Sequence, residues 1–270
     1  MKQDHKKIKI PLDYSTNQSG RNRIKPVFKC KDNSYRASFK HSRCLLTISV
    51  GQEIHESDKF SVTVDLINNA FSSCIILVDD TLQRHTMALD SDEDASFFYK
   101  SSLEAGDFWL ERNYQYYKNL AILEDIVRWD RWLNHPEYFK RETILKNLFQ
   151  KDPSYRKAFE NTIQAFLRRY RRRFLTEDLP SFNTARAHRL CLDYLLEENI
   201  ALSLWPELNC HFEVYPNQRN LAMSETHKRL VIPDYPTLLH AVSIKFKNRR
   251  QFKPQILIHC QSSNNSNKFI

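Results

Sequence analysis

Two short apolar runs on either side of an amphipathic segment constrain the fold of this chain more than any other feature. The runs are residues 45–49 and 74–78, and the segment 57–71 between them carries Phe60 and Val64 at helical spacing. A strand, a helix and a second strand in this order form a βαβ unit, whose two strands are parallel. We therefore predict an α/β fold with a mainly parallel central sheet flanked by helices.

The rest of the pattern indicates a single domain, since no internal repeat or long linker divides it. Helices are predicted over residues 92–120, 136–148, 152–174 and 184–202, and further strands over 27–30, 35–39, 210–215 and 255–259. The stretch 121–129 fits either a strand or a short helix, and 236–244 fits a helix alone or a helix and a strand. The domain is expected to span residues 28–260, between a mobile polar arm at 1–27 and a disordered tail at 261–270.

The chain is basic, because 41 Lys and Arg residues against 32 Asp and Glu give a formal net charge of +9. Such a charge favours polyanionic partners such as nucleic acid or an anionic membrane surface, although a merely soluble basic surface has the same composition. No apolar stretch reaches the roughly 18 residues of a membrane span, and the basic N-terminus lacks the apolar core of a secretory signal. The six cysteines show no CxxC spacing, so we expect a reducing, cytoplasmic location and no metal site.

Gly51 is conspicuous because the chain has only three glycines, where an average usage of about 7% predicts roughly nineteen. It follows the first apolar run, so the backbone is expected to turn tightly there. In an open α/β sheet, ligands bind outside the carboxyl ends of the strands. Ser49, the last residue of the run, therefore places a hydroxyl where reactions usually occur. The alternative is a serine that only caps a strand.

Several common catalytic signatures are absent from the sequence. There is no glycine-rich phosphate-binding loop, no GxSxG nucleophile elbow and no HExxH metal motif. His41 and His55 flank Ser49, so a Ser–His pair is conceivable, but a histidine in a loop is more often simply solvated.

A phenol and a carboxylate recur at helical spacing later in the chain. Tyr194 and Glu198 are four residues apart and share one face of the predicted helix. Together they can hold an ammonium group by hydrogen bonds and charge. The spacing alone is weak evidence, because Tyr138 and Glu142 repeat it and an ordinary amphipathic helix has the same pattern.

Taken in order, Ser49, the Tyr194–Glu198 pair and Tyr215-Pro216 resemble the tRNA-dependent cyclodipeptide synthases. That family has a serine after a strand of the pattern H-x-φ-φ-G-φ-S, where φ is aliphatic, and a later motif Y-φ-x-x-E-x-P. The matching positions are Leu45, Leu46, Ile48, Ser49, Tyr194, Leu195 and Glu198. The family's histidine, glycine and proline are replaced here by Arg43, Thr47 and Ile200.

The resemblance extends over about residues 40–220, including a stretch at 104–112 that is similar to the family's long helix. Gln52, Tyr215 and Pro216 match the branch of the family that has a Tyr-Pro pair. The resemblance implies a Rossmann-like domain similar to the catalytic domain of class I tyrosyl- and tryptophanyl-tRNA synthetases. Their ATP-binding signatures, HIGH and KMSKS, are missing, which fits a protein that needs no cofactor and receives amino acids already attached to tRNA.

The resemblance also implies roles for individual residues. Ser49 is expected to attack the ester of an aminoacyl-tRNA, and Tyr194 and Glu198 to hold the α-ammonium group of the aminoacyl moiety. Tyr215 is expected to relay a proton when the dipeptide cyclises, and Gln52 to orient the serine or the carbonyl oxygen. The residues expected to border the substrate are Leu45, Thr47, Gly51 and Val78. Thr47 in place of glycine is expected to make the pocket for the first side chain shallower.

The partners implied are two aminoacyl-tRNAs, with no membrane, and we expect a monomer. The candidate tRNA-binding residues are Lys100, Arg112 and Lys118, on the helix that carries the family's basic patch, and Arg168, Arg169 and Arg172 in a basic run. A set of cations at a helix C-terminus has the same appearance as that run.

Two other functions stay open at this point. The first is an RNA-binding module without chemistry. The second is a serine hydrolase or acyltransferase, which requires a histidine base near Ser49. A Rossmann-like methyltransferase ranks last, because the glycine-rich loop is absent.

Overall fold

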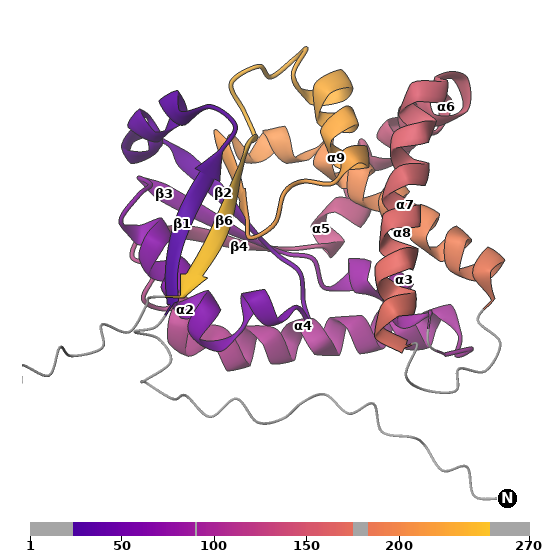
Figure 1. The fold of residues 1–270 in the computed structure, drawn as a ribbon, viewed down its shortest axis with the longest axis horizontal. Helices are drawn as coiled ribbons and strands as arrows, with labels where there is room; N and C mark the ends of the chain where they lie inside the picture. The colour runs from indigo at the N-terminus through magenta and orange to yellow at the C-terminus, as the bar shows by residue number, and fades with distance from the viewer. Residues whose placement is uncertain (1–23, 90, 175–182, 249–270) are drawn as a thin grey trace, which may run out of the picture.

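A six-stranded sheet forms the centre of the molecule (Figure 1). The computed structural model describes residues 24–89, 91–174 and 183–248. The strands are β1 (Ile24–Cys30), β2 (Arg43–Ile48), β3 (Ser73–Val78), β4 (Leu123–Arg128), β5 (Phe212–Tyr215) and β6 (His240–Asn248). The helices are α2 (Ser57–Asn68), α3 (Arg84–Met87), α4 (Ala95–Tyr117), α5 (Asp130–Leu133), α6 (Tyr138–Lys151), α7 (Pro153–Phe174), α8 (Thr184–Leu202) and α9 (Leu221–Thr226). Short 3-10 helices cover Asn33–Ala37, Phe39–His41, Glu53–His55, Thr81–Gln83 and Trp205–Leu208, and a π-helix covers His227–Val231.

The strand order is β1-β6-β5-β2-β3-β4, and every neighbouring pair is parallel except β1 with β6. The predicted α/β class and mainly parallel sheet are therefore confirmed. From β2 the chain builds outward to β3 and β4 on one side and, later, to β5 and β6 on the other. The carboxyl ends of β2 and β5 thus form a topological switch point, which is where ligands bind in open α/β sheets.

Helices cover both faces of the sheet. On one face, α2 and α4 bury Phe60, Val64 and Trp109 against β2 and β3. On the other face, the C-terminal end of α8 and the segment around Trp205 pack on the opposite side chains of the same strands, including Leu77. The helices α6 and α7 add a further layer against α8 (Figure 1). Because both faces are buried, β2 and β3 read as continuous apolar runs in the sequence.

The structure corrects several predicted boundaries. Residues 35–39 form 3-10 turns instead of a strand, because the Asp32 side chain accepts a hydrogen bond from Ser34 N and starts a turn. The strand β1 begins at Ile24, so the sheet includes part of the predicted arm, and the ambiguous stretches become β4 and β6. Residues 1–23, the predicted strand at 255–259 and the predicted tail lie outside the described residues.

Two glycines meet distinct geometric demands. Gly51 has a φ of +83°, and Gln52 N donates to Ser49 O at 3.2 Å, so residues 49–52 form the tight turn that the sequence predicts. At Gly106 of α4, a Cβ atom would lie 2.5 Å from Asp80 Oδ2 and 2.7 Å from an Arg128 nitrogen. The missing side chain therefore allows α4 to pack directly on the Asp80–Arg128 ion pair.

Candidate active site

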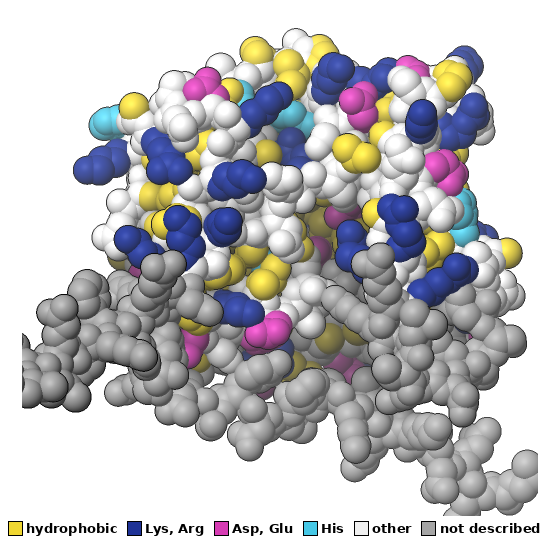
Figure 2. All heavy atoms as spheres, viewed as in Figure 1, with side chains coloured by type: hydrophobic (Ala, Val, Ile, Leu, Met, Phe, Trp, Pro, Cys, Tyr) yellow, Lys and Arg dark blue, Asp and Glu magenta, His cyan; other side chains and the backbone are white. Residues whose placement is uncertain are grey.

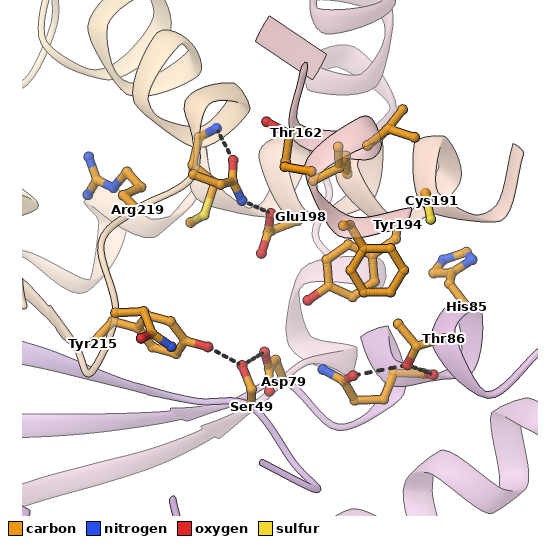
Figure 3. Close-up of a pocket in the computed structure, with 18 of the residues that line it drawn as sticks. Ser49, Asp79, His85, Thr86, Thr162, Cys191, Tyr194, Glu198, Tyr215 and Arg219 are labelled. Carbon is orange, nitrogen blue, oxygen red and sulfur yellow. Dashed lines mark hydrogen bonds between the residues drawn. The ribbon is translucent and has the colours of Figure 1, made fainter. Parts of the chain in front are cut away.

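Three oxygen-bearing side chains meet where adjacent parallel strands end. Ser49 follows β2, Asp79 follows β3 and Tyr215 ends β5. The Ser49 hydroxyl donates a hydrogen bond to Asp79 Oδ2 at 2.9 Å, and its oxygen lies 3.1 Å from the Tyr215 hydroxyl (Figure 3). The parallel register produces this meeting, because Ile48 lies beside Val78 and the next residue of each strand points to the other face.

Hydrogen-bond partners and burial define the state of these groups. The second oxygen of Asp79 accepts a hydrogen bond from Val50 N at 3.1 Å, so the carboxyl group holds two consecutive residues of the turn. Burial raises the pKa of Asp79 well above its ordinary value, and the Ser49 hydrogen bond opposes this rise. Burial also raises the pKa of Tyr215 to about 12. Tyr215 is therefore protonated at neutral pH, and since the one hydrogen of the Ser49 hydroxyl goes to Asp79, Tyr215 is the donor to Ser49.

Tyr194 and Glu198 reach the same place from α8 (Figure 3). The Asn183 side chain caps α8 by accepting from Arg186 N at 3.0 Å, and the separation of four residues puts the phenol and the carboxyl on one face. Burial raises the pKa of Glu198 to about 7, while Asn220 Nδ2 donates to it at 3.1 Å. Burial, with the nearby carboxyl groups of Glu198 and Asp79, raises the pKa of Tyr194 well above its usual range.

The repeated spacing at Tyr138 and Glu142 has a purely structural role. Tyr138 packs among the helices, and Glu142 Oε1 pairs with Lys146 Nζ on the surface at 2.8 Å. The spacing therefore becomes a site only in α8, which faces the carboxyl ends of the strands.

A buried ionic network anchors α8 next to Glu198. The Glu197 carboxylate is 6% exposed and accepts both terminal nitrogens of Arg84. It also pairs with His85 Nε2 at 3.2 Å and accepts from Trp129 Nε1 at 2.9 Å. The network ties α8 to the segment after β3 and to the end of β4, so it fixes the helix face that carries Tyr194 and Glu198.

These groups line one cavity of about 810 Å³ between the sheet and helices α7, α8 and α9. Thr47 lines it, and Gln52 lies at its rim with an exposed side chain. Leu45 is buried in the core beneath the cavity, Val78 points to the opposite face of the sheet, and Gly51 shapes the turn without lining the cavity.

The alternation of side chains along a strand explains why some residues that line the cavity were not predicted from the sequence. If Thr47 and Ser49 face the cavity, then their register partners Leu77 and Asp79 face it too, and Val78 does not. The sequence therefore predicts these cavity-facing residues once the two apolar runs are assigned to neighbouring parallel strands. Within the described residues, no three His, Cys, Asp or Glu side chains gather as metal ligands, and no helix has both the length and the apolar character to cross a bilayer.

Neither flanking histidine reaches the Ser49 hydroxyl as a base. His55 is buried, and its Nδ1 accepts a hydrogen bond from the backbone N of Ser49 at 3.2 Å. Burial lowers the pKa of His55 to about 3, so the ring is neutral. His41 lies before β2, at the other end of the strand. Neither of the two histidines on which the serine hydrolase alternative depended is therefore placed to act as its base.

The candidate tRNA-binding residues of α4 already have local partners. An Arg112 nitrogen lies 2.7 Å from the buried Glu56 carboxylate. Lys100 lies 3.9 Å from Glu104, and Lys118 Nζ lies 5.8 Å from the centre of a tyrosine ring of the same helix. Because α4 packs on the face of the sheet opposite the cavity, these cations do not surround the site.

The basic run near the end of α7 lies closer to the cavity. Arg168 and Arg169 are exposed, and Arg169 lines the cavity. The side chain of Arg172 lies outside what the structure describes. The run therefore contributes positive charge to one wall of the site.

Four exposed lysines that were not singled out form a second basic surface. This lysine face consists of Lys25 and Lys29 of β1 and Lys245 and Lys247 of β6. Tyr215 pairs with Ser243, and residues two apart share a face, so these lysines lie on the same face of the sheet as Tyr215. Figure 2 shows dark blue side chains over β1 and β6, beside a hollow in the same surface. The strict alternation from Val242 to Lys247 was the signal for this strand.

Comparisons with known proteins identify the family. No family model and no curated protein sequence matches the chain. A solved structure of a cyclodipeptide synthase from Fluoribacter dumoffii is 40% identical over 83% of this chain and 100% of its own, with a TM-score of 0.78. The chain belongs to the cyclodipeptide synthases. The enzyme is therefore an aminoacyltransferase of this family.

More distant structures of the family share the fold. A cyclodipeptide synthase from Candidatus Glomeribacter gigasporarum, bound to Phe-tRNAPhe, is 17% identical over 80% of this chain and 92% of its own, with a TM-score of 0.66. A Mycobacterium tuberculosis protein, whose structure relates cyclodipeptide synthetases to type I tRNA synthetases, is 10% identical over 84% and 93% of the two chains, with a TM-score of 0.54. The synthase therefore has the fold of class I tRNA synthetases, as the resemblance implied.

Proposed function

We propose that this synthase joins the amino acids of two aminoacyl-tRNAs through covalent intermediates on Ser49. The observation that carries the proposal is the placement of a serine hydroxyl opposite a phenol and a carboxyl group in one cavity. An aminoacyl ester offers a reactive carbonyl and an ammonium group on adjacent carbon atoms. Ser49 is suited to the first, and Tyr194 with Glu198 to the second.

In the first step, the Ser49 oxygen attacks the carbonyl carbon of the aminoacyl ester. The bond to the ribose oxygen breaks, and free tRNA leaves with a proton on that oxygen. Glu198 supplies charge for the ammonium group, and the protonated phenol of Tyr194 lies beside it. Holding ester and nucleophile together removes most of the entropic barrier to their encounter.

In the second step, the amine of another aminoacyl-tRNA attacks the serine ester, which frees Ser49 and leaves the dipeptide on the second tRNA. Ser49 then attacks the ester of this dipeptidyl-tRNA, which forms the dipeptidyl-enzyme and releases the second tRNA with a proton on its ribose oxygen. The free amine of the dipeptide then attacks the ester, releases Ser49 and closes the diketopiperazine ring. Tyr215, in contact with the serine oxygen, relays a proton in this ring closure. The volume of the cavity, about 810 Å³, supports a site for two aminoacyl groups, since small-molecule sites typically occupy about 300–1,000 Å³.

The lysine face is suited to the phosphates of the tRNA. It lies one to two strands from Tyr215, roughly 5–10 Å across the sheet at the usual strand spacing, and Lys245 and Lys247 extend it along β6 beyond Ser243, the partner of Tyr215. A tRNA whose aminoacyl end reaches Ser49 passes over this surface, and the α7 arginines border the other side. The G. gigasporarum synthase bound to Phe-tRNAPhe supports an aminoacyl-tRNA as the partner. We further propose membership of the Tyr-Pro branch, a monomer and a cytoplasmic location, where charged tRNA is available.

Product analysis tests the proposed reaction. Cultures that express the chain are expected to release a cyclic dipeptide detectable by mass spectrometry, and Ser49→Ala is expected to abolish it. Ser72→Ala, which removes a hydroxyl at the opposite end of the sheet, is the matched control and keeps product formation. Folded wild-type protein that yields no diketopiperazine and no adduct with any aminoacyl-tRNA contradicts the proposal.

Charge reversal tests the tRNA surface. Lys245→Glu with Lys247→Glu is expected to weaken tRNA binding by more than tenfold and to reduce its salt dependence. Lys151→Glu with Lys157→Glu makes the same change of charge at exposed sites of α6 and α7. Gel-shift titrations at two salt concentrations compare the pairs, and an equal loss in both contradicts a specific lysine face.

A further inference from the structure

We propose that Asp79 is the base that removes the proton from Ser49 when the serine becomes acylated. This inference rests on the proposed function, because it assigns the proton of the acylation step. Asp79 belongs to no motif on which the resemblance was based, and its carboxyl group touches the reacting oxygen. It is therefore assigned as a catalytic residue of the site.

The hydrogen bonds of the site direct the hydroxyl proton of Ser49 toward Asp79. The Ser49 hydroxyl has one hydrogen, which it donates to Asp79 Oδ2 at 2.9 Å. Tyr215 fills a second position on the same oxygen at 3.1 Å as a donor. Asp79 Oδ1 is fixed by Val50 N at 3.1 Å, so the carboxyl group cannot turn away without losing that bond. The pair is thus held within the distance that proton transfer requires.

The other groups near the hydroxyl are committed elsewhere. Tyr215, with a pKa of about 12, keeps its proton at neutral pH. The His55 ring accepts the backbone N–H of Ser49 and not the hydroxyl. Glu198 accepts from Asn220, and Tyr194 stands beside it on α8. Among the described side chains, Asp79 is the carboxyl group that accepts the hydroxyl proton of Ser49.

Binding of the substrate favours the ionised form of Asp79, which is the form that acts as a base. The titratable groups that face Asp79 are Glu198 and Tyr194 of α8, Tyr215 of β5 and the neighbouring Asp80, which is paired with Arg128. Burial and the carboxylate of Glu198 both favour the protonated form of Asp79. An ammonium group bound at Glu198 opposes that effect and favours the ionised, basic form. The aminoacyl group would therefore ionise its own base as it binds.

The step balances without a further reactant. The O–H bond of Ser49 breaks as its oxygen bonds to the carbonyl carbon, and the proton passes to Asp79. The tetrahedral intermediate then expels the ribose oxygen, which receives that proton from Asp79. The products are the aminoacyl ester of Ser49, a tRNA with a free hydroxyl and the original carboxylate.

Asp79→Asn tests the proposal, because asparagine keeps an oxygen for Val50 N but cannot take a proton. Purified chain is mixed with tRNA charged with all twenty amino acids, quenched at intervals and analysed by intact-protein mass spectrometry. We expect adduct formation to slow by about 10²–10⁴-fold, the usual contribution of general base catalysis. Asp234→Asn makes the same change at an exposed position and is expected to keep the wild-type rate. Circular dichroism and thermal melting check that both variants are folded.

Replacing the serine nucleophile by cysteine distinguishes an Asp79 that acts as a base from an Asp79 that only supports the structure. Thiols ionise near pH 8.5 without help, so in a Ser49→Cys background Asp79→Asn is expected to slow acylation by less than tenfold. An equal slowing in both backgrounds overturns the proposal, as does an unchanged rate of Asp79→Asn in the serine enzyme. If the Ser49→Cys variant forms no aminoacyl adduct, the alternative test is the Asp79→Gly variant, with formate added as a substitute for the missing carboxyl group. Restored acylation supports a base, and no restoration overturns it. A wild-type chain that takes no adduct instead contradicts the proposed function.

Discussion

Replacing Glu198 by glutamine is expected to stabilise the protein while it removes activity. Burial raises the pKa of Glu198 from the ordinary 4.5 to about 7, and each pKa unit between the folded and unfolded states corresponds to about 1.4 kcal/mol. Because the pKa is raised, the folded state keeps a proton that the unfolded state loses between pH 4.5 and 7. This contribution to stability is complete below pH 4.5 and is lost as the pH rises through 7. The ionised side chain therefore lowers the free energy of unfolding by up to about 3 kcal/mol at pH 8.

Urea denaturation of the wild type and Glu198→Gln at pH 5 and pH 8 measures this effect. Glutamine keeps an oxygen for Asn220 Nδ2, so the difference should reflect charge alone. The variant is expected to be more stable by about 3 kcal/mol at pH 8 and by about 1 kcal/mol or less at pH 5. Asp193→Asn, which removes a carboxylate at an exposed position of the same helix, is the matched control. A difference that is equal at both pH values, or a variant less stable at pH 8, refutes the reasoning.

Three further predictions concern the scaffold around the serine. Gly51→Ala should destabilise the fold by about 1 kcal/mol, because its φ is +83° although nothing crowds the Cβ position; Gly51→Asn should lose less in urea denaturation, and equal losses would contradict a backbone cause. Gly106→Ala should lower the free energy of unfolding by about 1–3 kcal/mol, since its Cβ meets Asp80 and Arg128, and an unchanged melting temperature would contradict that packing. The free energy of unfolding of the wild type should decrease as the pH falls below 6.5, because burial lowers the pKa of His55 in the folded state to about 3. The His55→Gln variant should not show this decrease. Between pH 6.5 and 5 this difference should reach about 2 kcal/mol, and a constant difference would contradict it.

Local patterns in the sequence were sufficient to predict the centre of the fold. The apolar runs before Ser49 and Asp79 are buried on both faces, so they appear as uninterrupted runs that the intervening helix must join in parallel. The phenol–carboxylate spacing in α8 also predicted side chains on one face. Its twin at Tyr138 and Glu142 shows why spacing alone is insufficient, since only tertiary packing decides which helix faces the strand ends.

What the sequence did not reveal depends on register and strand order. Val78 was expected at the substrate, whereas Leu77 and Asp79 face the cavity, because alternation assigns faces only after the pairing of two strands is known. The lysine face required β1 and β6 to be neighbours, although they are separated by more than 200 residues. Long-range pairing of this kind leaves little trace in a single sequence beyond the alternation within each strand.

The electrostatics of the cavity connect its stability to its choice of substrate. The charge of Glu198 favours the protonated form of Asp79, and the carboxylate of Glu213 favours the protonated form of Glu198. On the proposed function, the ammonium group of an aminoacyl ester offsets this repulsion between carboxylates. An N-blocked aminoacyl group brings no positive charge and leaves the repulsion in place. The same ammonium is the group whose amine later closes the diketopiperazine ring. Discrimination by charge at the first step therefore selects the substrates that are able to complete the last one.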